Sequence, residues 1–233
     1  MEINDPLVMV TGASGFIGKP LVDFLVRRKV RVRPCIRDTN SFFEGSKSAF
    51  ATGEISERTD WSEALRGVSV VVHMAARVHV MKDRSPNPLS EFRRVNVAAT
   101  VSLARQAVEA GVRRFVYLST VKVLGESSKF GLPLKASDPL KPCGPYAVSK
   151  AEAEIELLKI AAETGLEVVI IRPPLVYGSG VKANFSLLVN AIRAGFPLPF
   201  SLITQNRRSM VYLQNLIDFV FLCLEAPKAK NQI

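Results

Sequence analysis

Apolar residues follow two alternating spacings through most of the chain. Short continuous runs rich in Val and Ile are typical of strands buried on both faces of a parallel sheet. They predict strands at residues 7–11, 30–36, 68–73, 114–119 and 167–172. In the stretches between them, apolar residues recur every three or four positions. These stretches predict helices at residues 16–28, 89–110 and 146–163.

The alternation of strands and helices predicts an α/β fold. Strand–helix–strand units connect parallel strands, so we expect a Rossmann-like, doubly wound, mostly parallel sheet with helices on both faces over residues 1–172. Beyond this point the pattern is less regular, with further helices expected at residues 184–194 and 214–225. We expect residues 173–233 to be the start of a small C-terminal substrate lobe that is interleaved with the first domain.

Composition limits the class of protein. The chain has 233 residues, of which 48% are hydrophobic and 22% charged, so it can bury a substantial core. No apolar run approaches the roughly 18 residues of a membrane helix, and the acidic, polar N-terminus is unlike a signal peptide. Cys35, Cys143 and Cys223 are too few and too far apart for a disulfide framework or a metal site. We therefore expect a cytoplasmic protein with no bound metal and no membrane contact.

The formal net charge of +10 indicates an anionic partner. Nucleic-acid-binding proteins often gather Lys and Arg with aromatic residues on one face, whereas here the basic residues are spread along the chain. We expect no nucleic-acid partner. A small substrate or cofactor that carries phosphates is the other ligand that would account for the excess positive charge. This interpretation requires a binding site for it.

A glycine-rich segment, TGASGFIG at residues 11–18, lies between the first predicted strand and the first predicted helix. Gly12 permits a tight turn, Gly15 lets a pyrophosphate approach bare backbone, and Gly18 lets the helix pack close to the strand. The GxxGxxG spacing is one residue wider than the usual dinucleotide fingerprint. Its place at a strand-to-helix junction favours a dinucleotide site over three unrelated turn glycines.

Two further pairs of residues could carry chemistry. Tyr146 and Lys150 share one face of a predicted helix, so the lysine cation would lower the pKa of the tyrosine and make it a usable acid and base. The plainer interpretation is a surface pair on an amphipathic helix. Ser119 and Thr120 end a predicted strand, where ligands bind in doubly wound sheets, although polar residues also simply terminate strands.

Taken together and in order, the motifs resemble those of one family, the extended short-chain dehydrogenases/reductases. Within it, they are most similar to the nucleotide-sugar epimerases, dehydratases and reductases, such as UDP-glucose 4-epimerase. The similarity covers nearly the whole chain. The segments that carry it are TGASGFIG at 11–18, HMAA at 73–76, Asn96 within RVNVAAT, LSTVKVLG at 118–125, YAVSK at 146–150, RPPLVYG at 172–178 and RRSMVYL at 207–213.

The resemblance implies a role for each matching residue. Tyr146 would be the catalytic acid and base, Lys150 would lower its pKa and hold the nicotinamide ribose, and Thr120 would hydrogen-bond the reacting sugar oxygen. His73 and His79 are expected to be structural, because this chemistry uses tyrosine.

The resemblance also implies the binding residues. The expected cofactor is NADP or NAD, and the residues along it would be Gly12, Gly15, Phe16, Ile17, Gly18, Arg37, Ala75, Asn96 and Lys150. The expected substrate is a UDP-sugar or another nucleotide sugar. Asn184 and Arg208 would grip its diphosphate, with Ser119 and Thr120 at the sugar.

Three departures from the family pattern refine the prediction. The second strand ends in Arg37, where NAD-preferring members have an acid, which favours NADP with Arg33 as a rival ligand of the 2′-phosphate. Val121 and Lys122 stand where 4,6-dehydratases have an Asp–Glu pair, so 4,6-dehydratase activity is not expected. Family members are commonly longer, so the substrate lobe is expected to be partial.

The expected reaction is hydride transfer at carbon 4 of a UDP-sugar. Segments 118–125 and 172–178 are most similar to reductases of 4-keto sugar nucleotides, and an NADP pocket fits net reduction. UDP-hexose 4-epimerase is the alternative. A non-catalytic NAD(P)-binding regulator is the alternative from another class, but such proteins tend to lose the tyrosine or the lysine that this chain keeps. We expect a homodimer that pairs through helices 89–110 and 146–163.

Overall fold

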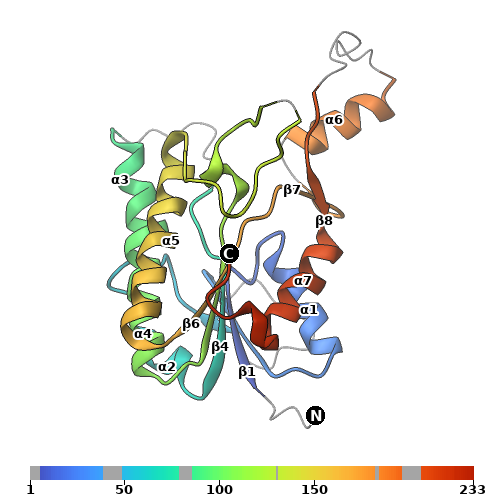
Figure 1. Ribbon diagram of the computed structural model, residues 1–233. Coiled ribbons are helices and arrows are strands. Elements are labelled where there is room, and N and C mark those ends of the chain that lie inside the picture. The colour runs from blue at the N-terminus through green and yellow to red at the C-terminus, as the bar shows by residue number, and fades with distance from the viewer. Residues whose placement is uncertain (1–5, 39–48, 79–85, 130, 182–183, 196–205) are drawn as a thin grey trace.

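The centre of the computed structural model is a six-stranded parallel sheet (Figure 1). The structure describes residues 6–38, 49–78, 86–129, 131–181, 184–195 and 206–233. Across the sheet, the strands are β3 (Phe50–Ala51), β2 (Val32–Ile36), β1 (Leu7–Thr11), β4 (Val68–His73), β5 (Arg114–Leu118) and β6 (Glu167–Ile171). The strand order reverses between β1 and β4. In open α/β sheets, ligands bind at such a switch point, outside the carboxyl ends of the strands.

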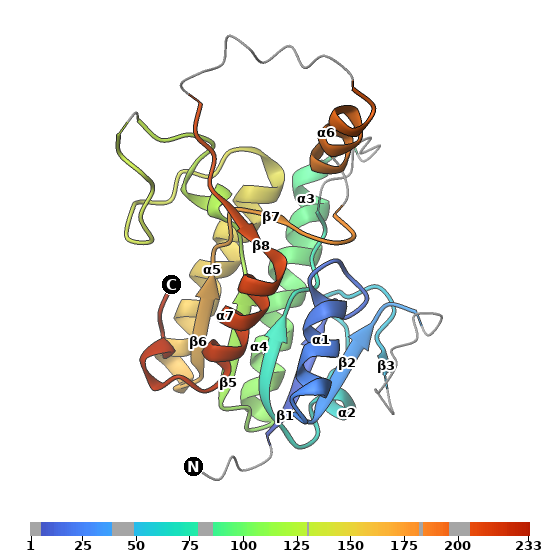
Figure 2. The same ribbon diagram turned by 90° about the vertical axis from the view of Figure 1, so that its right-hand side faces the viewer.

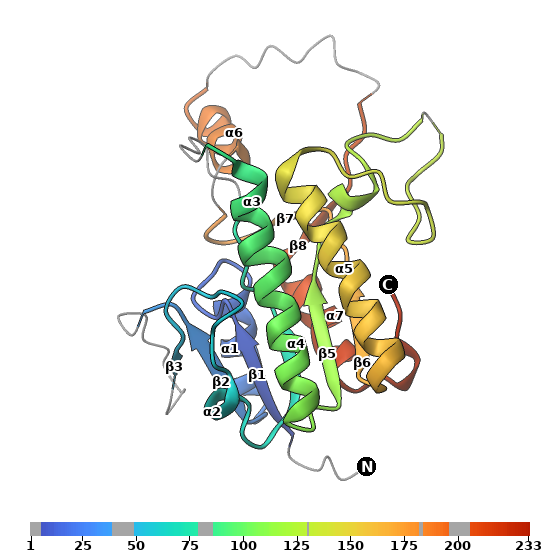
Figure 3. The same cartoon turned by 90° about the vertical axis from the view of Figure 1, so that its left-hand side faces the viewer.

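Helices cover both faces of this sheet (Figures 1 and 3). One face carries α1 (Gly18–Arg27) and α7 (Leu213–Glu225), and the other carries α3 (Pro88–Arg93), α4 (Ala99–Glu109) and α5 (Gly144–Thr164). The predicted doubly wound α/β fold is therefore confirmed. Within the described ranges, no helix is both long and apolar enough to cross a membrane.

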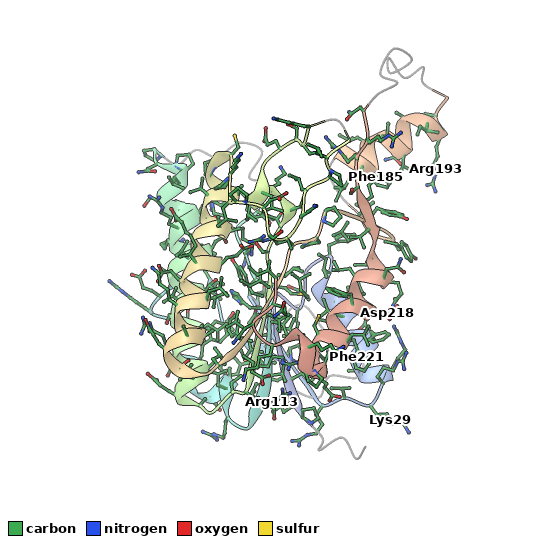
Figure 4. All side chains as sticks on the ribbon, in the orientation of Figure 1. Lys29, Arg113, Phe185, Arg193, Asp218 and Phe221 are labelled. Atoms are coloured by element: carbon green, nitrogen blue, oxygen red, sulfur yellow. The ribbon has the colours of Figure 1, made fainter. Side chains whose placement is uncertain are left out.

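Each face of the sheet has its own hydrophobic core, because successive side chains of a strand point to opposite faces. In β1, Val8 and Val10 join the cluster with α1 and α7, whereas Met9 joins the cluster with α4 and α5. Phe221 of α7, labelled in Figure 4, meets Phe24 of α1 edge-on with ring centroids 5.5 Å apart. A helix near the end of the described chain thus completes the core that the first helix begins.

The boundaries predicted from the sequence agree with the observed ones to within two residues. The sequence does not predict the short elements, because a few residues cannot show a periodic pattern. These are β3, α2 (Ser62–Leu65), η2 (Val121–Leu124), β7 (Leu175–Tyr177), β8 (Met210–Tyr212) and η3 (Pro227–Ala229).

The predicted helix at residues 89–110 has an interruption. A π-helical segment, η1 (Arg94–Ala98), lies between α3 and α4. Such a segment widens one turn of the helix and is frequent at functional sites. Asn96 lies within η1 and is buried. Apolar spacing does not separate a widened turn from a regular one, so the sequence predicts a single α-helix here.

The described residues after position 172 form two separate parts, one away from the large sheet and one packed on it (Figure 2). β7 and β8 form a two-stranded parallel sheet, and α6 (Asn184–Arg193) lies beyond it, away from the large sheet. α7 then returns to the large sheet, and Gln232 forms an isolated parallel bridge with Val169 of β6. The division into a dinucleotide-binding domain and a substrate lobe at residue 172 remains a prediction, and α7 packs with the first of these parts.

Candidate active site

The glycine-rich turn lies at the carboxyl end of β1 and packs against the segment after β4. Gly12 has a φ of +66°, and a Cβ atom there would lie 2.8 Å from the backbone nitrogen of Ala75. A Cβ atom at Gly18 would collide with the carbonyl group of Gly12. Close backbone contacts therefore exclude larger residues at both positions and bring Ala75 against the turn.

The start of α1 can accept an anion. No side chain caps this helix, and its first turn contains no acidic residue. The N–H groups and the positive dipole end of a helix N-terminus attract phosphate. Gly15 is exposed, and a Cβ atom there would meet only the Gly12 carbonyl oxygen within 4 Å. These features, with Phe16 and Ile17 at the helix start, fit the pyrophosphate of a dinucleotide.

Hydrogen bonds connect the glycine-rich turn to the interior. Thr11 Oγ1 accepts hydrogen bonds from the backbone N–H groups of Met74 (3.1 Å) and Ala75 (3.2 Å). Its hydroxyl hydrogen is then directed to His73 Nδ1, 2.7 Å away. Because Nδ1 accepts, Nε2 carries the ring hydrogen and donates it to Thr100 Oγ1 at 2.9 Å.

His73 is a neutral, buried residue in this network. Burial and, secondly, the positive charge of Lys150 lower its pKa to about 3. It therefore keeps one charge state near neutral pH and links β4 to β1 and α4. This arrangement agrees with the structural role expected for it. The other histidine, His79, lies outside the described residues.

Asn96 joins the π-helical segment to α5. Its Nδ2 donates to Ser149 Oγ and to the carbonyl of Arg77, both at 3.0 Å, and its Oδ1 accepts from the N–H of Arg77 at 2.8 Å. Ser149 donates in turn to the carbonyl of Tyr146 (2.8 Å). Both hydrogens of the Asn96 side-chain amide are thus bonded within the protein. Through Ser149, Asn96 helps to hold the backbone at Tyr146 in place.

Tyr146 lies in the first turn of α5, where its ring meets that of Phe92 at a centroid distance of 6.3 Å. Burial raises the pKa of Tyr146 to about 12. The lowering that the sequence predicts from Lys150 is not seen in this arrangement. Burial is the cause of the raised value, and the Lys150 ammonium lies over the ring of Tyr117.

Lys150 is the charged group at the centre of the site. It is 2% exposed, and its Nζ lies 4.1 Å from the ring centroid of Tyr117, a fully buried residue of β5. Burial lowers the pKa of Lys150 to about 7, against the opposing effect of the Glu154 carboxylate. A lysine that changes charge near neutral pH is typical of acid/base sites. Tyr117 belongs to none of the sequence motifs; the signal for it is its position two residues before Ser119, on the same strand face.

Ser119 and Thr120 follow β5 at its carboxyl end. Ser119 is 3% exposed, and its Oγ has no hydrogen-bond partner in the described part of the chain. Thr120 Oγ1 caps η2 by accepting a hydrogen bond from the N–H of Lys122 (3.3 Å). Because the Thr120 hydroxyl only accepts a hydrogen bond in this cap, its hydrogen can still be donated to a ligand.

A buried ion pair holds α5 to the segment after β6. Arg172 binds both carboxylate oxygens of Glu154, and its Nη2 lies 2.6 Å from Oε2. The two side chains are 8% and 1% exposed. Arg172 also donates to the carbonyl of Ala136 (2.9 Å). No sequence motif indicates that Arg172 and Glu154 form a pair. The pair places a fixed carboxylate one helical turn from Lys150.

The arginines of β2 have different surroundings. Arg33 Nη1 donates to the carbonyls of Ala64 (2.7 Å) and Arg66 (2.8 Å) at the end of α2. These hydrogen bonds engage Nη1 of Arg33, and its assignment as a rival phosphate ligand stays a prediction. Arg37 is exposed directly after β2. It is followed by Asp38, which is exposed near the end of the strand. The interpretation of the second strand from sequence did not include this acidic residue.

The residues expected to bind the diphosphate lie in the second part of the chain. Asn184 begins α6, and Arg208 is exposed in the segment before β8. The Asn184 side chain lies outside the part of the chain that the structure describes. The grouping of both residues around one diphosphate with Thr120 remains a prediction.

A doubly wound sheet has a glycine-rich turn at its switch point, and a half-buried Tyr146 stands one helical turn before the buried Lys150; together they define an enzyme of the extended short-chain dehydrogenase/reductase type. Comparison with known proteins gives the family. The family model described as "NAD dependent epimerase/dehydratase family" matches residues 8–233, and the chain belongs to this family.

Individual relatives agree with this assignment. Over 97% of its length, the chain is 44% identical to UDP-glucose 4-epimerase from Vibrio cholerae, and it covers 69% of that protein. It is 30% identical to DesIV, the dTDP-glucose 4,6-dehydratase of Streptomyces venezuelae solved with NAD, with a TM-score of 0.78 over 97% of this chain and 74% of that one. MoeE5 in complex with UDP-glucose and NAD is 28% identical, with a TM-score of 0.77 over 96% and 73% of the two chains. The predicted family and enzyme class are therefore confirmed.

Proposed function

We propose that this enzyme transfers hydride at carbon 4 of a UDP-linked hexose, with a nicotinamide cofactor as the hydride partner. The observation that carries the proposal is the buried Lys150, which lies one helical turn after Tyr146 on α5, and burial lowers its pKa to about 7. Interconversion of an alcohol and a ketone needs such an acid/base pair beside the cofactor. The similarity to UDP-glucose 4-epimerase and to MoeE5 with UDP-glucose supports carbon 4 and UDP.

Tyr146 moves the proton in this proposal. When the sugar carbon loses hydride, its hydroxyl loses a proton, which the Tyr146 phenolate takes up and returns on reduction. Burial opposes the phenolate, and the Lys150 ammonium favours it, so the pair must work together. Thr120 donates its hydroxyl hydrogen to the reacting oxygen, and the preceding Ser119 has an Oγ without a hydrogen-bond partner among the described residues.

The glycine-rich turn and the start of α1 would hold the cofactor pyrophosphate, with Ala75 alongside and Lys150 at the ribose. When bound, the nicotinamide accepts or donates the hydride. Both DesIV and MoeE5 were solved with NAD. We nevertheless propose a preference for NADP here, because the exposed Arg37 offers a cation to a 2′-phosphate, whereas Nη1 of Arg33 is already bound to carbonyls at the end of α2.

We favour net reduction of a UDP-4-keto-hexose over other reactions at this site. A reductase releases its cofactor in every cycle, and an NADP pocket suits net reduction. Dehydration at carbons 5 and 6 is not expected, because Val121 cannot titrate and Lys122 has the wrong charge for the acidic pair. The test is to mix the protein with a UDP-4-keto-hexose and NADPH and to follow both. Consumption of one NADPH for each sugar reduced is the expected result.

UDP-hexose 4-epimerase is the second candidate, and the 44% identity to a UDP-glucose 4-epimerase favours it. An epimerase returns the hydride that it took, so it retains its cofactor. The same assay distinguishes the two reactions. Interconversion of two UDP-hexoses with no net change in NADPH would establish the epimerase and exclude the reductase.

We also propose a homodimer in which α4 and α5 of one subunit pack against the same helices of its partner. These helices lie side by side on one face of the sheet (Figure 3), and Ile155 of α5 is 43% exposed there. Light scattering of the purified protein, with Ile155→Glu as the disrupting variant, measures the assembly. The cytoplasm is the proposed location, in keeping with free thiols at Cys35 and Cys223.

A further inference from the structure

Lys150 is buried among few polar groups. In the described part of the chain its Nζ makes no hydrogen bond, and it lies over the ring of Tyr117, 4.1 Å from the ring centroid. Glu154, one helical turn away, has both carboxylate oxygens bound by Arg172. Burial of an ammonium without a hydrogen-bond partner disfavours its charged form, so a neighbour that favours the charge has a strong influence on the titration of Lys150.

The groups around Lys150 leave the Tyr117 ring as its main short-range partner. His73 of β4 is neutral near pH 7. Burial keeps Tyr117 protonated by raising its pKa well above the ordinary value, and Tyr146 on α5 is also protonated at neutral pH. Glu154 favours the ammonium, but it does so through space and from within its own ion pair.

The Tyr117 ring is itself held firmly. It stacks on the His73 imidazole with ring centroids 5.9 Å apart and an interplanar angle of 17°. His73 is fixed by Thr11 on one side and Thr100 on the other. The ring therefore presents a fixed, electron-rich surface, and an aromatic face attracts a cation more strongly when water is excluded.

We propose that Tyr117 is a positioning residue whose ring face holds the Lys150 ammonium in place and in its charged form. Tyr117 touches neither substrate nor reacting atoms, and it acts on Tyr146 only through Lys150. The consequence for turnover rests on the proposed function. The consequence for the titration of Lys150 does not, because it concerns the protein alone.

The experiment measures that titration directly. Protein labelled with ¹³C at the lysine ε-carbon is titrated by NMR without substrate, and the Lys150 signal is assigned by its loss in Lys150→Arg. The test variants are Tyr117→Phe, which keeps a ring, and Tyr117→Leu, which removes it. The matched control is Phe115→Leu, because Phe115 is also fully buried on β5 and contacts His73, with ring centroids 5.8 Å apart.

We expect the midpoint of the Lys150 titration to fall by about one pH unit in Tyr117→Leu, while Tyr117→Phe and Phe115→Leu keep the wild-type midpoint. An unchanged midpoint in folded Tyr117→Leu, or an equal fall in Phe115→Leu, would overturn the proposal. If Tyr117→Leu does not fold, phenylalanines with increasing numbers of fluorine atoms at position 117 replace it. They keep the volume of the ring and weaken its electron-rich face, so the midpoint should fall stepwise with fluorination, and a constant midpoint would refute the cation–ring interaction.

A second readout links the interaction to catalysis. The pH profile of turnover should move in Tyr117→Leu and should not move in Phe115→Leu, because only the first variant changes the charge of Lys150. A protein that lacks carbon-4 activity but shows the NMR shift would contradict the proposed function and leave the role of Tyr117 intact. A pH profile that moves equally in both variants would indicate a general packing effect and would contradict the positioning role.

Discussion

The side-chain amide of Asn96 and the hydroxyl of Ser149 are 3.0 Å apart, and their hydrogen bond joins the π-helical segment η1 to the helix that carries the acid/base pair. Ser149 immediately precedes Lys150 and donates to the carbonyl of Tyr146. The position of the acid/base helix therefore depends on a local widening in the neighbouring helix.

Asn96→Ala should destabilise the protein. The substitution leaves the backbone N–H and carbonyl of Arg77, and the hydroxyl of Ser149, without their buried partner. We expect a loss of about 2–3 kcal/mol in the free energy of unfolding, measured by denaturant titration. Asn87→Ala is the matched control, because Asn87 caps α3 at an exposed position and its removal should cost about 1 kcal/mol. Equal losses in the two variants would contradict a supporting role for Asn96.

Tyr146→Phe should abolish turnover and keep cofactor affinity. The hydroxyl takes part in proton transfer, which contributes roughly 10²–10⁴-fold to the rate, and it adds little to ground-state binding. Turnover and the dissociation constant of NADPH are measured on the same preparation. Activity close to that of the wild type would refute the assignment of Tyr146 as acid and base.

Arg37→Ala should weaken binding of NADP far more than binding of NAD. The guanidinium at the end of β2 would pair with the 2′-phosphate, which NAD lacks. Arg33→Ala makes a useful comparison, because Arg33 donates to carbonyls at the end of α2 and should affect thermal stability instead of cofactor choice. Titration of both cofactors against both variants and the wild type decides the question, and equal losses for NAD and NADP in Arg37→Ala would rule out the NADP site.

Stability should fall as the pH is lowered, and His73 is one source of this dependence. In the unfolded chain its pKa is near the ordinary value of about 6.5, whereas burial lowers it to about 3 in the fold. Between these two values the unfolded chain binds more protons, so the contribution of a neutral His73 is complete above about pH 6.5 and is lost towards pH 3. Denaturant titrations at several pH values should show a shallower slope for His73→Gln than for the wild type over this range, by up to about 1.4 kcal/mol per pH unit. Identical slopes would mean that His73 is protonated in the fold.

The fold could be predicted because the buried strands are unusually uniform. β1 (LVMVT) and β4 (VSVVVH) consist mostly of apolar residues, and their predicted bounds match the observed ones. The helices flanking them show clear amphipathic spacing, so strand and helix alternate without ambiguity. The widened turn around Asn96 could not be predicted, because it changes the direction of side chains without changing the sequence pattern.

The site was only partly predictable for a similar reason. Local motifs locate Gly12 and Tyr146, but they do not show which distant side chain a buried group will meet. Tertiary packing across the sheet places Lys150 over the Tyr117 ring and directs Arg33 to a carbonyl at the end of α2. The pKa of Tyr146 depends on the same packing, which is why the sequence suggests a lowered value and the structure shows a raised one.

The return of α7 to the first face of the sheet has a consequence for synthesis of the chain. The contact of Phe24 with Phe221 links helices at opposite ends of the described sequence. As the ribosome delivers the N-terminal strands, Val8 and Val10 have α1 beside them, but they lack α7 until Leu213–Glu225 has been made. This half of the protein therefore emerges with an apolar surface open to solvent and to chaperones, and its folding is completed late, by a long-range contact.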